Sequence, residues 1–189
     1  MSTLKVDTIL KRTGTGTITV GQSGDTISIP SGATLNSAGT NTLEGINNTP
    51  SFYSYSTGAL SIANSTNTNL SHLTLEGFDS NGTYDTSNQR WTPGLVGKYY
   101  VYMTTKVSDM TTRFQVVLYK NGSLIPEAEG QIASENMGGG SSTYPNVVGA
   151  ALVNVTSTTD YYQAYAWQNS GGSKSFYNSR FMAFRILGA

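Results

Sequence analysis

Few residues of this chain have side chains that could perform catalysis or hold a metal. His72 is the only histidine, and the chain has no cysteine. An imidazole acts as a base or a ligand in the company of an orienting carboxylate or of two to three further ligands. No second histidine, cysteine or acidic pair accompanies His72. We therefore expect it to be a polar residue of a strand or turn, and we expect no metal site.

Three glutamates form the other candidate group for chemistry. Glu127, Glu129 and Glu135 could supply the carboxylate pair of a glycosidase. They lie in the stretch 126–138, which is bounded by Pro126 and Gly138 and is typical of an exposed loop. The sequence thus predicts no catalytic residue and no cofactor, and we expect a protein that is not an enzyme.

The charge balance excludes several classes of partner. The chain has 189 residues, with 11 Lys and Arg against 11 Asp and Glu, and charged residues make up 12% of it. Nucleic-acid binding needs a basic stripe that neutralises phosphates, and a polybasic membrane anchor needs a cluster of the same kind. No apolar run reaches the roughly 18 residues of a spanning helix, and the first residues lack the apolar core of a signal peptide. We expect no nucleic acid and no membrane insertion.

The elements that could position any site fall into two parts. No aromatic residue precedes Phe52, and aromatic residues recur from there to the C-terminus. We predict an N-terminal segment over residues 1–50 and a folded domain over residues 51–189.

The N-terminal segment has apolar residues at alternating positions between Gly, Ser, Thr and Asn, which predicts short strands. Such thin strands bury too little surface to order alone, so we expect them to pair with copies of the chain or with a docking partner. A flexible Gly/Thr-rich linker is the alternative. The candidate attachment residues are Leu4, Val6, Ile9, Ile18, Val20, Ile27 and Ile29.

The second part predicts an all-β domain. Runs rich in β-branched and aromatic residues, such as 99–103, 114–119 and 161–167, are separated by turn signals that include Asn121-Gly122. No stretch has a sustained helical period. The predicted fold is an antiparallel β-sandwich of the jelly-roll type.

One set of spacings in this domain resembles the C1q domain pattern. That pattern runs Phe, five residues, Asn or Asp, four, an aromatic or Leu, six, Phe, five, and then Gly-x-Tyr-x-Phe-x-aromatic, and every interval recurs here. At four positions, Leu73, Trp91, Val101 and Met103, a different bulky apolar residue stands where the family has its usual aromatic residue. The resemblance covers roughly residues 51–189 and implies a C1q/TNF-like jelly roll that forms a homotrimer. The matching residues are Leu73, Asp79, Tyr84, Trp91, Gly97, Tyr99, Val101 and Met103.

Two predicted strands, 97–103 and 161–167, carry large apolar side chains on both faces. In 97–103, alternation sends Tyr99 to one face and its neighbours Tyr100 and Tyr102 to the other. An outward face of a sandwich is usually polar, so this doubling predicts a second contact, unless a loop covers the face. The candidate trimer interface is Tyr100, Tyr102, Tyr161, Tyr165 and Trp167.

The opening stretch, Ser2 to Ile9, with the Gly/Thr/Ser-rich segment after it, resembles the start of fibre and other structural proteins of tailed phages, especially those of marine cyanobacteria. With a C1q-like domain that lacks cysteine, this resemblance implies a virion protein assembled in the host cytoplasm, either a capsid decoration or a short head or tail fibre. Its N-terminal segment, residues 1–50, would act as an arm that binds capsid or tail proteins, and its folded domain, residues 51–189, would face outward as a knob. Two alternatives remain. One is a tail-fibre receptor-binding protein that recognises a host surface glycan through loops such as Gly138 to Tyr144, and the other is a glycan-degrading enzyme.

Overall fold

The computed structural model describes residues 20, 22–28, 31–33, 48–109, 112–125, 133–136 and 145–186, with only the backbone of 133–136. The chain divides into two units, Met1–Thr42 and Leu43–Ala189.

The described residues of the first unit include two turns and no strand. The Asp25 N–H donates to the Gln22 carbonyl at 3.0 Å, and the Gln22 N–H donates to the Asp25 carboxylate at 2.7 Å. Val20 and Ile27 are 59% and 60% exposed. The other candidate attachment residues, Leu4, Val6, Ile9, Ile18 and Ile29, lie outside the described residues. Pairing of this segment with other chains stays a prediction.

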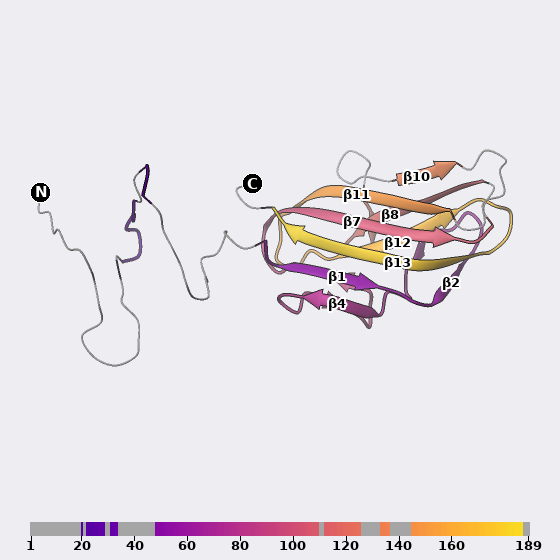
Figure 1. Cartoon of the computed structure of the whole chain (residues 1–189), viewed down its shortest axis with the longest axis horizontal. Helices are drawn as coiled ribbons and strands as arrows, with labels where there is room; N and C mark the ends of the chain where they lie inside the picture. The colour runs from indigo at the N-terminus through magenta and orange to yellow at the C-terminus, as the bar shows by residue number, and fades with distance from the viewer. Residues whose placement is uncertain are drawn as a thin grey trace, which may run out of the picture. The chain divides into compact units, whose positions relative to one another are not determined.

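The second unit contains a six-stranded antiparallel sheet, called sheet A, with the order β11-β7-β13-β1-β4 and with β2 paired to β13. Figure 1 shows these five strands at the front of the domain in that order, from top to bottom. Its strands are β1 (Ser51–Tyr55), β2 (Ala59–Ile62), β4 (Leu75–Asp79), β7 (Gly97–Val107), β11 (Asn146–Val155) and β13 (Lys174–Arg185).

Sheet B has seven strands in the order β10-β8-β12-β6-β5, with β3 paired to β12 and β9 paired to β8. In Figure 1, β8 and β12 lie behind sheet A. The strands are β3 (Thr68–Asn69), β5 (Tyr84–Asp85), β6 (Arg90–Trp91), β8 (Arg113–Lys120), β9 (Ser123–Leu124), β10 (Ala133–Asn136) and β12 (Tyr162–Gln168). The two sheets make the predicted all-β sandwich. Among the described residues, no helix is long and apolar enough to cross a membrane.

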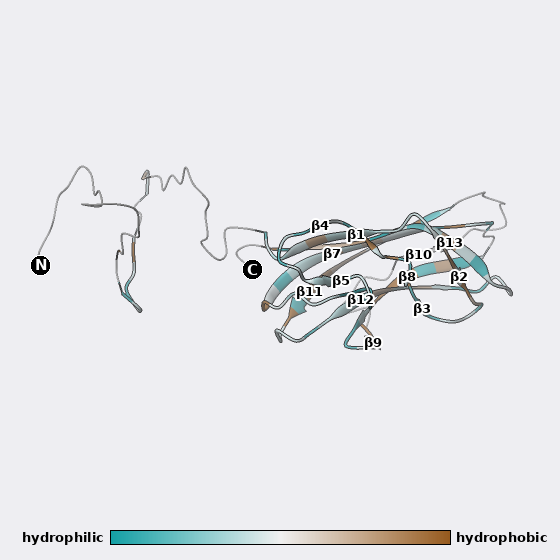
Figure 2. Cartoon of the chain, turned by 90° about the horizontal axis from the view of Figure 1, so that it is seen from below, coloured by the Kyte–Doolittle hydropathy of each residue, from teal (hydrophilic) through white to brown (hydrophobic). Residues whose placement is uncertain are grey.

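Strand alternation builds the core between the sheets. Tyr99, Val101 and Met103 of β7 are fully buried, whereas Tyr100 and Tyr102 are half-buried on the opposite face, as predicted. In Figure 2 the strands change repeatedly between hydrophilic and hydrophobic colours along their length, as expected when each strand has one face in the core.

Phe52 of β1 lies at the centre of this core. Its ring stacks on Tyr84 at a centroid distance of 4.9 Å and on Trp91 at 5.3 Å, and it meets Phe181 edge-on at 4.9 Å. Trp91 in turn contacts Tyr99 at 5.1 Å. Residues of the C1q-like spacing therefore meet around an aromatic residue that the spacing does not contain.

A β-bulge interrupts β13. Tyr177 pairs with Lys106 and Arg180 pairs with Thr104, so Asn178 and Ser179 together oppose the single residue Thr105. Asn178 has a φ of 48°, in the left-handed region. The extra residue reverses the inside-outside order of the strand, because alternation alone would put Phe176 and Phe181 on opposite faces. Both rings are fully buried.

Candidate interaction surfaces

The outward side of sheet A, which we call the sheet A face, carries a broad band of apolar side chains. Its middle row runs straight across the sheet, because each member pairs with the next one in the strand register. The neighbouring row contains Leu152, Tyr100 and Phe184. Burying large apolar groups is the main source of free energy in protein association. The middle row is Ala150, Tyr102, Met182, Tyr53 and Phe78.

The sheet A face is open in the single chain. Leu152 is 69% exposed, Phe78 is 54% exposed and Phe184 is 40% exposed. Exposed lysines, Lys98 and Lys106, lie at the two ends of β7. An apolar centre with charged residues at its margin is the usual anatomy of a protein interface.

Gly77 shapes one edge of the sheet A face. The ring of Tyr53 lies over this glycine, and a Cβ at position 77 would come within 2.9 Å of Cε1 of Tyr53 and closer still to Cδ1. Tyr53 stacks on Tyr55 with a centroid distance of 5.6 Å. The missing side chain at position 77 thus lets the Tyr53 ring lie flat across the sheet.

The outward side of sheet B, which we call the sheet B face, has a different chemistry. Tyr119 and Tyr165, from adjacent strands, stack with centroids 3.9 Å apart and planes 17° apart. Trp167 lies on the same face of β12, with Cζ of Arg113 5.9 Å from its ring centroid. Tyr161 just before the strand takes a similar contact from Arg90, at 5.2 Å. Aromatic, cationic and amide side chains share this face.

The structure divides the five predicted interface residues between the two faces. Tyr100 and Tyr102 lie on the sheet A face, whereas Tyr165 and Trp167 lie in sheet B, on the other side of the sandwich, and Tyr161 directly precedes its strand β12. Local alternation identifies outward side chains but does not say which sheet a strand joins. The apolar residues of β1, β4 and β13 that complete the sheet A face were not predicted, although their alternation could have indicated them.

The residues of the C1q-like spacing have mainly structural roles. Leu73, Tyr84, Trp91, Tyr99, Val101 and Met103 are buried in the core. Asp79 ends β4, where its carboxylate accepts hydrogen bonds from the Tyr84 N–H at 2.7 Å and from the Thr83 hydroxyl at 3.1 Å. Gly97 begins β7 with a φ of 144°, which a residue with a side chain rarely adopts.

His72 takes part in a buried chain of polar groups. Its Nε2 lies 2.9 Å from Oγ of Ser179, which lies 2.7 Å from Oγ1 of Thr105. Burial lowers the pKa of His72 to about 4, so the ring is neutral at neutral pH. Ser179 is fully buried, and His72 Nδ1 has no hydrogen-bond partner within the part of the chain that the structure describes. A substrate could not reach this serine, so the pair joins strands and does not form a nucleophile and its base.

The candidate glutamates are only partly placed. Glu135 lies in β10, opposite Phe114 of β8 in the register, and therefore in a strand rather than in the predicted loop. Glu127, Glu129 and the loop Gly138 to Tyr144 lie outside the described residues. Among the described side chains, no group of three or more His, Asp and Glu is arranged to hold a metal ion.

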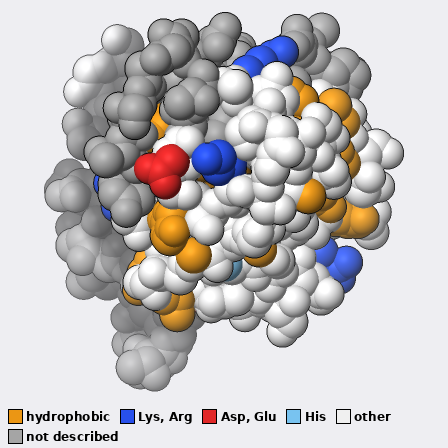
Figure 3. All heavy atoms as spheres, turned by 90° about the vertical axis from the view of Figure 1, so that its right-hand side faces the viewer, with side chains coloured by type: hydrophobic (Ala, Val, Ile, Leu, Met, Phe, Trp, Pro, Cys, Tyr) orange, Lys and Arg blue, Asp and Glu red, His pale blue; other side chains and the backbone are white. Residues whose placement is uncertain are grey.

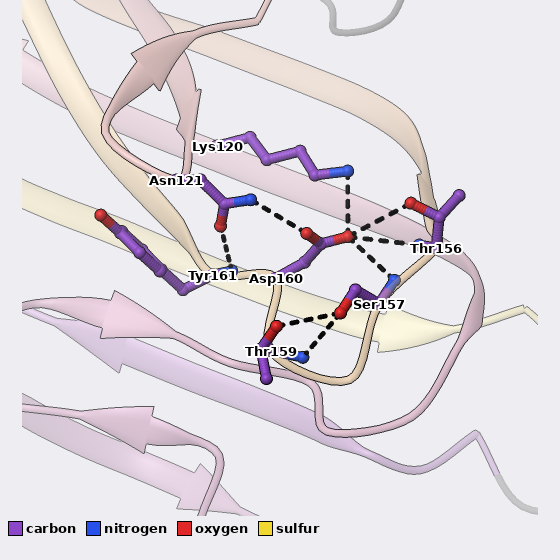
Figure 4. Close-up of polar contacts among 7 residues, drawn as sticks. All are labelled: Lys120, Asn121, Thr156, Ser157, Thr159, Asp160 and Tyr161. Atoms are coloured by element: carbon purple, nitrogen blue, oxygen red, sulfur yellow. Dashed lines mark hydrogen bonds and ion pairs between the residues drawn. The ribbon is translucent and has the colours of Figure 1, made fainter.

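Asp160 organises the loops at one end of sheet B (Figure 4). Its carboxylate lies 3.0 Å from the Lys120 ammonium and accepts hydrogen bonds from Asn121 Nδ2 at 2.9 Å and from the Ser157 N–H at 3.1 Å. Desolvation alone would raise the pKa of Asp160, but the hydrogen bonds from Asn121, Lys120 and the backbone outweigh it and lower the pKa to about 2. The carboxylate fastens the Asn121-Gly122 turn to the loop before β12.

A cleft of about 500 Å³ lies beside this loop, lined by Lys120 together with Ile125, Val153 and Tyr162. Its cation is already paired with Asp160. The cleft therefore offers a mixed polar and apolar surface and a neutralised charge.

The end of the domain seen in Figure 3 has few charged side chains, and uncharged polar groups and backbone cover most of the surface that is not grey. Apolar side chains gather at its sides. This distribution agrees with the low charge of the sequence.

The sandwich resembles solved structures of one fold. The globular domain of zebrafish complement 1qA protein is 14% identical with a TM-score of 0.54, and the match covers 72% of this chain and 97% of that one. Eiger TNF from S. frugiperda is 10% identical (TM-score 0.51, 74% and 95% covered), and murine APRIL is 10% identical (TM-score 0.52, 72% and 98% covered). The chain matches no protein-family model and no curated protein. These likenesses establish the C1q/TNF-type jelly-roll fold that the spacing predicted.

Proposed function

We propose that this chain is a non-enzymatic structural protein that forms a homotrimer through the sheet A face and is displayed on a phage particle. The observation that carries the trimer is the apolar row that crosses five strands of sheet A and remains open in the single chain. C1q and TNF-type jelly rolls are homotrimers, and the shared fold supports the same assembly here.

Threefold symmetry suits this surface. In a cyclic trimer, one part of a surface contacts a different part of the same surface on the next copy. The sheet A face has two such parts, because β11 at one edge presents Leu152 and β4 at the opposite edge presents Phe78. Closing three copies around the sheet A face would remove the large exposed apolar groups from water.

The virion role rests on the sequence. The resemblance of the opening stretch to tailed-phage fibre proteins supports it, as do the low charge and the lack of cysteine. In this proposal the N-terminal arm binds a capsid or tail protein, while the jelly roll projects outward as a capsid decoration or a short fibre. The full burial of Ser179, the hydrogen-bond partner of His72, supports a role without catalysis.

Two experiments test the proposal. Light scattering of the full-length protein should give about three times the chain mass of 20.1 kDa, and a monomer would contradict the trimer. To test the virion role, phage particles should be produced with the full-length chain and, separately, with a chain from which residues 1–45 are deleted. The full chain should be found by mass spectrometry in purified particles and located by immunogold labelling at the head or tail. The deleted form should remain trimeric and be missing from the particles, and its retention there would contradict attachment through the arm.

A further inference from the structure

The sheet B face lies on the opposite side of the sandwich from the proposed trimer surface, so trimer formation would leave it accessible. We propose that this face binds a carboxylated glycan, with Trp167 and the tyrosine pair contacting sugar rings and Arg113 pairing with the carboxylate. The site goes beyond the proposed structural role and does not depend on it.

Aromatic rings provide the apolar part of the site. Tyr119 and Tyr165 stack at 3.9 Å and act as one rigid block, and Trp167 follows Tyr165 on the same face of β12. All three side chains are half-buried, so their bodies are anchored in the sheet while part of each ring meets solvent. One face of a pyranose ring carries C–H groups and is apolar, which suits contact with such rings.

Amide side chains provide the polar part. Gln115 lies opposite Trp167 in the strand register, and Asn69 lies opposite Tyr165. The side-chain oxygens of both amides are buried and lack a hydrogen-bond partner within the described residues, whereas each side chain as a whole is half-buried. Because an amide group also carries an NH2 donor, these half-buried side chains can donate to the hydroxyls at the edge of a sugar whose face rests on the neighbouring ring.

Arg113 determines the charge of the expected ligand. Its guanidinium lies over the Trp167 ring and makes no ion pair in the described part of the chain, where the ion pairs are Arg90 with Asp85 and Lys120 with Asp160. A guanidinium binds a carboxylate through two parallel hydrogen bonds. The aromatic and amide groups therefore lie beside a free cation, a combination that fits a uronic or other sugar acid.

The same features disfavour the other partners. A single-stranded nucleic acid also stacks on aromatic rings, but its phosphates need a basic groove, and on this face Arg113 is the one described cation that has no carboxylate partner. A second copy of the chain fits the apolar sheet A face better, because the exposed Arg113 of the sheet B face would lose water without gaining a matched partner.

Tryptophan fluorescence offers a direct test, because the chain has two tryptophans and Trp91 is fully buried. Tetragalacturonate, with neutral cellotetraose for comparison, is titrated into the full-length protein while fluorescence and heat are measured. Tetragalacturonate should bind and change the emission, and Trp167→Phe should abolish the change. Trp167→Ala should weaken binding at least about tenfold.

Arg113→Gln should weaken tetragalacturonate binding about tenfold and leave any binding of cellotetraose unchanged, whereas the control Arg185→Gln on sheet A should bind as the wild type does. Melting temperature and light scattering check that each variant is folded. The proposal is overturned if the wild type does not bind tetragalacturonate, or if Trp167→Ala and Arg113→Gln bind it normally. It is likewise overturned if oligo(dT) binds in preference to the sugar acid and loses binding in Trp167→Ala.

Discussion

Tyr100 and Phe184 lie opposite each other on adjacent strands, with ring centroids 5.4 Å apart and planes 37° apart. Both rings point away from the core, and Leu152 lies on the other side of Tyr100 in the register. The contact fixes the two rings relative to each other before any partner binds. A surface that is already ordered loses less conformational entropy on association.

Tyr102 lies at the centre of the sheet A face, so a charge there should prevent self-association. Tyr102→Asp should give monomers in light scattering, because a carboxylate buried between copies would lose its hydration without a partner. Tyr102→Phe keeps the ring and should remain trimeric. A trimeric Tyr102→Asp protein would mean that association uses another surface.

Gly77→Ala should weaken the trimer while leaving the fold intact. The added methyl group would push the Tyr53 ring off the sheet A face, and the ring can turn toward solvent without disturbing the core. Trimer dissociation on dilution, followed by mass photometry, should therefore occur at a higher protein concentration than in the wild type. Gly58→Ala is the matched control, since a Cβ at Gly58 would meet no atom within 4 Å. Equal dissociation of the two variants would refute a role for the Tyr53 position.

Removing the Asp160 carboxylate should destabilise the domain. Its side chain is only 8% exposed, and Asp160→Ala leaves Lys120 and Asn121 without their shared acceptor. We expect a loss of about 2–3 kcal/mol in the free energy of unfolding, measured by urea denaturation at pH 7. Asp85→Ala, at an exposed pair with Arg90, should cost less. A smaller loss in Asp160→Ala than in Asp85→Ala would contradict the structural role of the carboxylate.

His72 should make stability depend on pH. Its pKa is lowered by burial from 6.5 to about 4, so the unfolded chain binds a proton more readily than the folded one. The contribution to stability is fully present above pH 6.5 and is lost as the pH falls from there through 4. The urea midpoint should thus fall between pH 7 and pH 5, and His72→Gln, which has no titrating group, should fall less. Identical pH dependence in the two proteins would rule His72 out as the cause.

The sequence predicts the sandwich and the outward position of Tyr100 and Tyr102, because alternation within a strand is a local property. It does not separate these residues from Tyr165 and Trp167, because sheet membership depends on pairing between distant strands. The contact between His72 and Ser179 spans 107 positions. No local pattern contains it, and the surroundings of His72 in the sequence predict only a polar residue of a strand or turn.

The bulge at Asn178 changes which residues of β13 face the core. Before the bulge the even-numbered Phe176 is buried, and after it the odd-numbered Phe181 is buried. Residues after it, including Met182 and Phe184, face outward only because the count is offset by one. Deleting Asn178 would bring either Phe176 or Phe181 to the surface. In the second case, Phe181 and Ala183 would turn outward and Met182 and Phe184 would turn toward the core. The residues that β13 contributes to the proposed trimer surface thus depend on a residue outside that surface, and the loss of one position would replace them with residues that now pack in the core.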